Sequence, residues 1–225
     1  MHTFRSALAV AVVGIALSSL QARADIELKV SDGTTTVSAN DLLTPGTVTY
    51  MGAIGKFTFT ANIGAGFPGI GAPTYPILDL TSVDLTTRTT GGTLTVSLTE
   101  TGFAPTTVAM ELLSRIVGNY NNSNATMDTY FDATDNPFGT GTLLSSGLFD
   151  NQAGVATLPP MAGPYSLTEI ITVDAGANSL TSLDAIIDAP EPTALSLFGA
   201  GFVGLAFFGW RRWLRAARRI PAATA

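Results

Sequence analysis

The chain has no cysteine and only one histidine, His2, among its 225 residues. The absence of cysteine excludes disulfide bonds, thiolate metal sites and a cysteine nucleophile. Removal of the segment that carries His2 would leave no imidazole for general-base catalysis, a Ser-His-Asp triad or a histidine metal site. Any catalysis would then depend on carboxylates, tyrosines, hydroxyl groups and a few basic side chains. We therefore expect a protein that is not an enzyme and that needs no cofactor.

Charge is also scarce, since only 12% of the residues are charged, and it is unevenly placed. The segment 25–189 holds sixteen acidic residues but only four basic ones, a net charge of −12. Those four are Lys29, Lys56, Arg88 and Arg115. An acidic segment of this kind repels phosphate groups, so we expect no nucleic-acid partner.

The first 24 residues have the composition of a secretory signal peptide. Arg5 precedes an apolar run at 7–17, and Ala22-Arg23-Ala24 matches the small-residue cleavage pattern. The alternative is an uncleaved membrane anchor, for which this run is short. We expect cleavage after Ala24 and a mature chain that begins outside the cytoplasm.

The C-terminal region predicts a membrane span. Residues 194–210 carry no charge and cover roughly 25 Å as a helix. Two tryptophans, Trp210 and Trp213, suit the membrane interface, so residues 194–213 are expected to contact the bilayer. The positive-inside rule places the arginines that follow in the cytoplasm: Arg211, Arg212, Arg215, Arg218 and Arg219. The alternative is a buried core helix with a basic surface tail.

Two stretches match G-x-G-x-x-G, a pattern of dinucleotide-binding sites, but neither has the required context. GAGFVG at 199–204 lies inside the predicted span, and GAGFPG at 64–69 is followed closely by prolines. The pattern has meaning only between a strand and a helix, so we expect no nucleotide site.

Pro190, Glu191 and Pro192 stand directly before the apolar run and the arginine cluster. This order resembles the PEP-CTERM sorting signal of exported bacterial proteins, over residues 190–219. The short tail at 220–225 is longer than the usual abrupt ending. The resemblance implies that an exosortase, a membrane-embedded cysteine transpeptidase, recognises the tripeptide, cleaves nearby and releases or transfers the upstream domain. It also implies a single-pass anchor before processing and a cell-surface or extracellular location afterwards.

Residues 25–189 have the pattern of an all-β domain. Short runs rich in β-branched and aromatic residues are separated by glycine, proline and asparagine turns, which favours an antiparallel, jelly-roll-like β-sandwich. The expected strands are 26–30, 34–38, 47–51, 56–61, 77–85, 92–100, 125–131, 166–173 and 179–187. Asp32-Gly33 and Gly91-Gly92 predict turns between strand pairs. Segment 107–117 is compatible with a helix or a strand, and the all-β setting favours a strand.

The densest polar segment is 119–136, which we interpret as a turn region flanking a strand. Asp128, Asp132 and Asp135 are the candidate ligands for a Ca²⁺ ion, although their spacing does not match an EF-hand.

Two functional hypotheses remain. The first is a non-catalytic surface or extracellular-matrix protein, associated with exopolysaccharide and biofilm. The second is a secreted carbohydrate-binding or hydrolytic sandwich with the same tag. Both tryptophans lie in the predicted anchor, which leaves the domain without the best sugar-stacking side chain and favours the first hypothesis.

Overall fold

The computed structural model describes residues 24–189, so the predicted signal peptide up to residue 23 and the predicted membrane span lie outside the described residues. Within this part the chain forms ten β-strands and no α-helix. The strands are β1 (Ile26–Ser31), β2 (Thr36–Asn40), β3 (Thr47–Ile54), β4 (Phe57–Ala65), β5 (Ile77–Thr87), β6 (Gly92–Phe103), β7 (Met110–Asp132), β8 (Thr142–Leu148), β9 (Gln152–Leu158) and β10 (Tyr165–Asp188). No helix long and apolar enough to cross a membrane occurs between residues 24 and 189.

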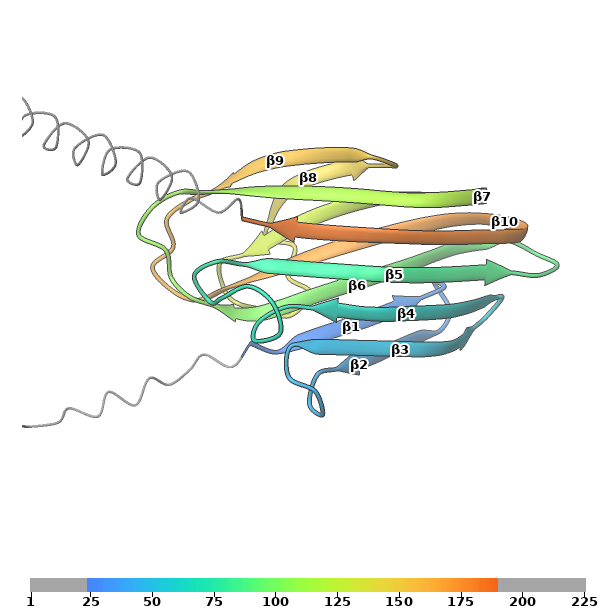
Figure 1. The fold of residues 1–225 in the computed structure, drawn as a ribbon, viewed down its shortest axis with the longest axis horizontal. Helices are drawn as coiled ribbons and strands as arrows, with labels where there is room; N and C mark the ends of the chain where they lie inside the picture. Colours follow the sequence, from blue (N-terminus) through green and yellow to red (C-terminus); the bar gives the residue numbers. More distant parts are fainter. Residues whose placement is uncertain (1–23, 190–225) are drawn as a thin grey trace, which may run out of the picture.

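All strand pairs are antiparallel, and the strands form one continuous sheet that is folded into two layers (Figure 1). One layer runs β2-β1-β6, then the first half of β10, the second half of β7, and β8. The other runs β3-β4-β5, then the second half of β10, the first half of β7, and β9. The prediction of an all-β, antiparallel fold is therefore confirmed.

The two long strands β7 and β10 pair along nearly their whole length and pass together from one layer to the other. Their register shifts between Ala175 and Leu180 on β10, opposite Asn122 on β7. Asn122 and Asn178 have positive φ, and the Asn122 side-chain amide donates a 2.8 Å hydrogen bond to the carbonyl of Ala177. Asparagine tolerates this backbone region better than most residues, so both strands can reverse direction here. This reversal is called the fold-over below.

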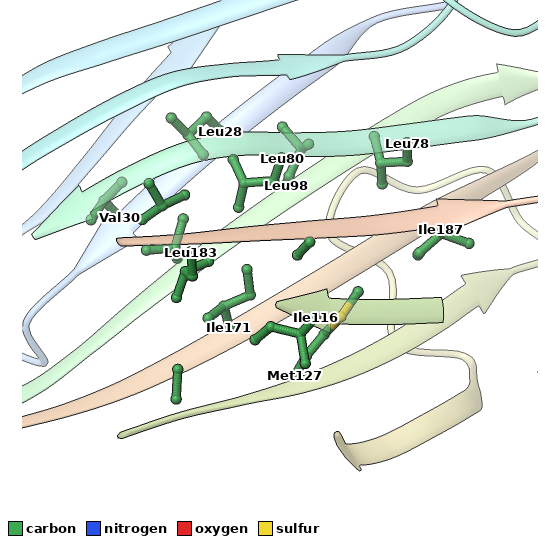
Figure 2. Close-up of a cluster of buried hydrophobic side chains, with 14 of the residues drawn as sticks. Leu28, Val30, Leu78, Leu80, Leu98, Ile116, Met127, Ile171, Leu183 and Ile187 are labelled. Carbon is green, nitrogen blue, oxygen red and sulfur yellow. The ribbon is translucent and has the colours of Figure 1, made fainter. Parts of the chain in front are cut away.

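The core lies between the layers and consists of the inward-facing residues of each strand. Leu28, Leu80 and Leu98 come from β1, β5 and β6 and are fully buried (Figure 2). Near the β7–β10 pair, Ile116, Met127 and Ile171 continue the same cluster. The alternation of apolar and polar residues, such as Leu94, Val96 and Leu98 on β6, is what places one face of each strand in this core.

The predicted strands are all present, and the shift at the start of β2 has a local cause. The strand expected at 34–38 begins at Thr36, because the Asp32 carboxylate accepts the backbone N–H groups of Thr34 and Thr35 and holds them in the turn. Segment 107–117 is a strand from Met110 onward. The edge strands β8 and β9 were not predicted, because their small residues and largely exposed side chains give little hydrophobic alternation.

The interpretation of 119–136 as a turn region is wrong for most of its length. Residues up to Asp132 belong to β7, and only 133–136 lie in the loop that follows. The polar side chains of this segment lie at the fold-over, where the paired strands β7 and β10 pass from one layer to the other and their residues face solvent. The strands expected at 107–117 and 125–131 are thus both parts of β7. Likewise, the strands expected at 166–173 and 179–187 are both parts of β10.

Replacing Phe59 with alanine tests the core. Phe59 is fully buried, and its ring centroid lies 5.8 Å from that of Tyr50. We expect Phe59→Ala to lower the free energy of unfolding of residues 25–189 by about 3–5 kcal/mol, measured by urea denaturation. Met51 is 73% exposed, so Met51→Ala should change it by less than about 0.5 kcal/mol. Equal effects of the two variants would show that Phe59 is not in the core.

Candidate functional site

The end of β10 brings the chain directly from the middle of the sheet to the Pro190-Glu191-Pro192 tripeptide. Asp188 pairs with Ile77 on β5 and with Leu113 on β7. The backbone N–H of Ala189 donates a 3.2 Å hydrogen bond to the carbonyl of Pro76, and Ala189 is buried. No linker therefore separates the domain from the tripeptide, which lies outside the described residues together with the five arginines.

The start of the domain is also attached to the sheet by a backbone hydrogen bond. The carbonyl of Asp25 accepts a hydrogen bond from the N–H of Thr101, and Ala24 is buried. Ala24 is one of the two residues of the predicted cleavage pattern, and the other, Ala22, lies outside the described residues.

A hollow of about 400 Å³ lies on the outer face of the layer that contains β5, β7 and the second half of β10. Register places Asp79, Ile186 and Arg115 in one row across the three strands. Thr81, Val117, Asp184 and Ala185 complete its lining. No aromatic side chain is among these lining residues, so the hollow offers hydrogen-bonding groups and charge but no stacking platform for a sugar ring.

The charges in the hollow influence one another. Partial burial and the nearby Asp184 raise the pKa of Asp79 to about 6, and Arg115 opposes both. Asp184 is held in place because its Oδ1 accepts a 2.7 Å hydrogen bond from the N–H of Ser82, a residue with positive φ. The hollow thus combines a carboxyl group that titrates near neutral pH, a second carboxyl group and a guanidinium, which suits a ligand rich in hydroxyl groups.

Two glutamates are fully buried inside the sandwich on the neighbouring strands β6 and β10. Glu100 Oε1 accepts a 2.9 Å hydrogen bond from the N–H of Phe67. Its Oε2 and both oxygens of Glu169 have no hydrogen-bond partner among the described residues. Burial raises the pKa of Glu100 to about 9, with Asp41 adding to the shift and the Phe67 hydrogen bond opposing it. Burial, followed by the charge of Asp79, raises the pKa of Glu169 well above its usual range. The Glu100 side chain is therefore neutral at pH 7.

A buried tyrosine, Tyr165, lies near Glu100. Its ring stacks on Phe103 with centroids 5.4 Å apart, and its hydroxyl is buried without a partner among the described residues. Burial and the nearby Glu100 raise the pKa of Tyr165. The raised pKa values of this interior group arise where no substrate has access, since all three side chains are fully buried.

The three aspartates considered for Ca²⁺ each accept a backbone hydrogen bond from a different segment. Asp128 accepts from the N–H of Gly147 at 2.8 Å, and Asp135 from that of Gly102 at 2.7 Å. Asp132 accepts from the N–H of Thr134 at 2.7 Å. No group of three or more potential metal-binding side chains occurs in the described part of the chain, so the three are not gathered into one site.

The glycine-rich stretch at 64–69 lies at the end of β4 and in the loop that follows it. Gly64 and Ala65 end β4, and the rest begins the loop to β5 at 66–76. The loop leads into a strand and not into a helix, as expected for a connection between strands.

The hollow was missed by sequence reasoning, because its residues come from three strands far apart in the chain. The single available signal was Arg115, one of only four basic residues in the acidic segment.

Comparison with known proteins identifies the C-terminal region. A family model for the PEP-CTERM protein-sorting motif matches residues 188–212. The chain carries this sorting motif. The PEP-CTERM signal begins at the last residues of β10 and continues beyond the described residues. No curated protein sequence matches the chain.

Several solved structures show weak likeness to the domain. The enzymatically active domain of tailspike protein 4 from bacteriophage CBA120 is 13% identical, with a TM-score of 0.28, and the match covers 62% of this chain and 20% of that one. TmCBM61, solved in complex with β-1,4-galactotriose, is 9% identical, with a TM-score of 0.29 and coverage of 62% and 92%. TmCBM27, a mannan-recognising carbohydrate-binding module, is 9% identical, with a TM-score of 0.28 and coverage of 64% and 88%. Likenesses this weak do not indicate a function.

The buried Glu100 predicts a pH-dependent stability. Below about pH 4.5 the carboxyl group is neutral in the folded and in the unfolded protein, whereas between about pH 4.5 and 9 it ionises only in the unfolded chain. The free energy of unfolding therefore falls as pH rises through this window, by at most about 1.4 kcal/mol per pH unit. Glu100→Gln removes the ionisation. We therefore expect the free energy of unfolding of the variant to exceed that of the wild type by roughly 3 kcal/mol at pH 7 and to match it near pH 4.

Urea denaturation of residues 25–189 across this pH range measures the difference. Glu111 is exposed on β7, and Glu111→Gln is the control that should leave the pH slope unchanged. An unchanged slope in Glu100→Gln would show that Glu100 is ionised in the folded protein.

Proposed function

We propose that this PEP-CTERM protein is a non-catalytic exported protein of the cell surface or extracellular matrix, sorted by an exosortase. The observation that carries the proposal is the junction at Ala189, where the last core strand ends immediately before the tripeptide. Cleavage near Pro190-Glu191-Pro192 would separate the domain from its anchor without removing any strand of the sandwich.

The chemistry of the tripeptide suits this role. Proline restricts the residue before it to extended conformations, so the sequence predicts an extended, non-helical tripeptide. An extended, charged tripeptide between a folded domain and an apolar span is accessible to a membrane-embedded protease. Before processing, the protein would be a single-pass anchor with its arginines in the cytoplasm.

The proposal that the domain is not an enzyme rests on where its two most strongly perturbed acids lie. Glu100 and Glu169 have the largest upward shifts among the carboxyl groups of described residues, and both are sealed in the core. A general acid or nucleophile must reach its substrate, which these side chains cannot do. The hydroxyl-rich, acidic exterior is instead compatible with a hydrated exopolysaccharide matrix or biofilm.

A second candidate function is supported by the hollow of Asp79, Arg115 and Asp184. Carboxyl and guanidinium groups in one depression can bind a hydroxylated ligand such as a carbohydrate. A glycan array with residues 25–189 tests it against Arg115→Ala and the control Lys56→Ala. Our main proposal predicts no glycan bound above background. Binding that is lost in Arg115→Ala and kept in Lys56→Ala would establish the second function.

The sorting proposal is tested in a host that contains an exosortase. A C-terminal epitope tag should be lost from the wild-type protein found outside the cytoplasmic membrane. Glu191→Ala, or joint replacement of Pro190 and Pro192 by alanine, should leave a tagged form in the membrane fraction, because the apolar run still inserts. Fractionation and immunoblotting measure both forms.

Deletion of 211–219 is the matched comparison for this experiment. It keeps the tripeptide but removes the charges that hold the tail inside, so membrane retention and orientation should weaken. A wild-type surface protein that keeps its tag would show that the segment is a plain anchor and that the sorting proposal is wrong.

A further inference from the structure

The domain has a loop face at the end where β10 terminates. It is formed by the loops at 66–76, 104–109 and 159–164, called the end face below. The N–H of Ala104 donates to the carbonyl of Pro73, and Thr106 and Met161 exchange backbone hydrogen bonds, so the loops are tied to one another. In Figure 1 the green loop between β6 and β7 and the orange loop between β9 and β10 reach furthest beyond the strands on this side.

The end face carries no charged residue in any of its three loops. Val108 is 68% exposed, and Phe67, Ile70 and Met161 are partly exposed. The neighbouring loop at 41–46 adds the exposed Leu42 and Leu43, while its one acid, Asp41, is buried and accepts a hydrogen bond from the N–H of Gly46.

The opposite end of the sandwich differs in charge. Its turns between paired strands carry Asp32, Lys56 and Arg88. Acidic residues flank the end face on adjoining segments: Asp25 before β1, the exposed Glu111 at the start of β7, and Asp135 in the loop that follows β7. The loops where the chain leaves the domain thus expose Val108, Leu42 and Leu43 and contain no basic residue.

The distance to the predicted span is short. Five residue steps separate Ala189 from Ala194, where the apolar run begins, and they extend over about 17 Å at most. The headgroup layer on one side of a bilayer takes up roughly 5–7 Å of this length. The end of the domain is therefore held close to the headgroups whenever the apolar run spans the membrane.

We propose that the end face rests on the outer surface of the bilayer, with Val108 and its apolar neighbours in the headgroup region. This inference depends on the membrane anchor of the proposed function. Apolar side chains favour the headgroup and acyl boundary, and the absence of basic residues means that the contact needs no anionic lipid. The contact orients the domain and holds the cleavage tripeptide at the level of the membrane surface.

Single fluorophore labels test this contact, because the chain has no cysteine of its own. The full chain is exported and purified from a host without exosortase, then placed in phosphatidylcholine vesicles. Val108→Cys is labelled with an environment-sensitive dye and quenched with nitroxide lipids. Val155 on β9 is the matched control, since it is also a valine and is 67% exposed, and Leu180 reports on the opposite end.

We expect quenching at position 108 to exceed that at positions 155 and 180 several-fold. Flotation of the vesicles separates the two proposals. If the protein floats with the vesicles and the three positions are quenched equally, the end face does not contact lipid and this inference is wrong while the anchor stands. A chain that fails to float would overturn the anchor and the inference with it.

Discussion

The backbone hydrogen bonds between β7 and β10 join the two layers of the sandwich, because both strands run through one layer, reverse together and return through the other. Every other strand attaches to this pair of strands either directly or through one or two intervening strands. The Asn122 side chain and the positive φ of Asn122 and Asn178 allow the reversal at one place, and the alternation of buried residues then brings both halves of the ribbon to the same core. A buried hydrogen bond between Ser114 and Thr129, 3.0 Å long, connects the two halves of β7 directly across it.

The core formed in this way contains groups that a hydrophobic interior normally excludes. The pKa values of Glu100 and Glu169 are raised because transfer of their charged forms into the interior carries a large free-energy cost. Each carries at least one oxygen that no described residue satisfies. Their protonation couples the stability of the domain to pH, so the domain is more stable in acid than in base as far as these two groups are concerned.

The same ribbon also sets the relation between the domain and its sorting signal. Because β10 is an interior strand that ends at Asp188, the chain leaves from the middle of the sheet and continues directly into the PEP-CTERM signal. Three uncharged loops lie at this end, whereas the turns that carry Asp32, Lys56 and Arg88 lie at the other end. Anchor, cleavage tripeptide and apolar end face are therefore arranged along one axis of the molecule in our proposal.

Local sequence determined the class of fold, most strand positions, the turn at Asp32-Gly33 and the sorting signal, because alternation, turn chemistry and a contiguous motif depend only on neighbouring residues. The signal peptide and the membrane span stay predictions for residues outside the described part. Tertiary structure alone decided that four expected strands are two long ones, since a reversal between layers looks like a turn in the sequence. It also decided that Asp79, Arg115 and Asp184 share a hollow and that Glu100 is buried. Strand register joins residues distant in the chain, and burial depends on what packs against them, so neither could be inferred from the order of residues.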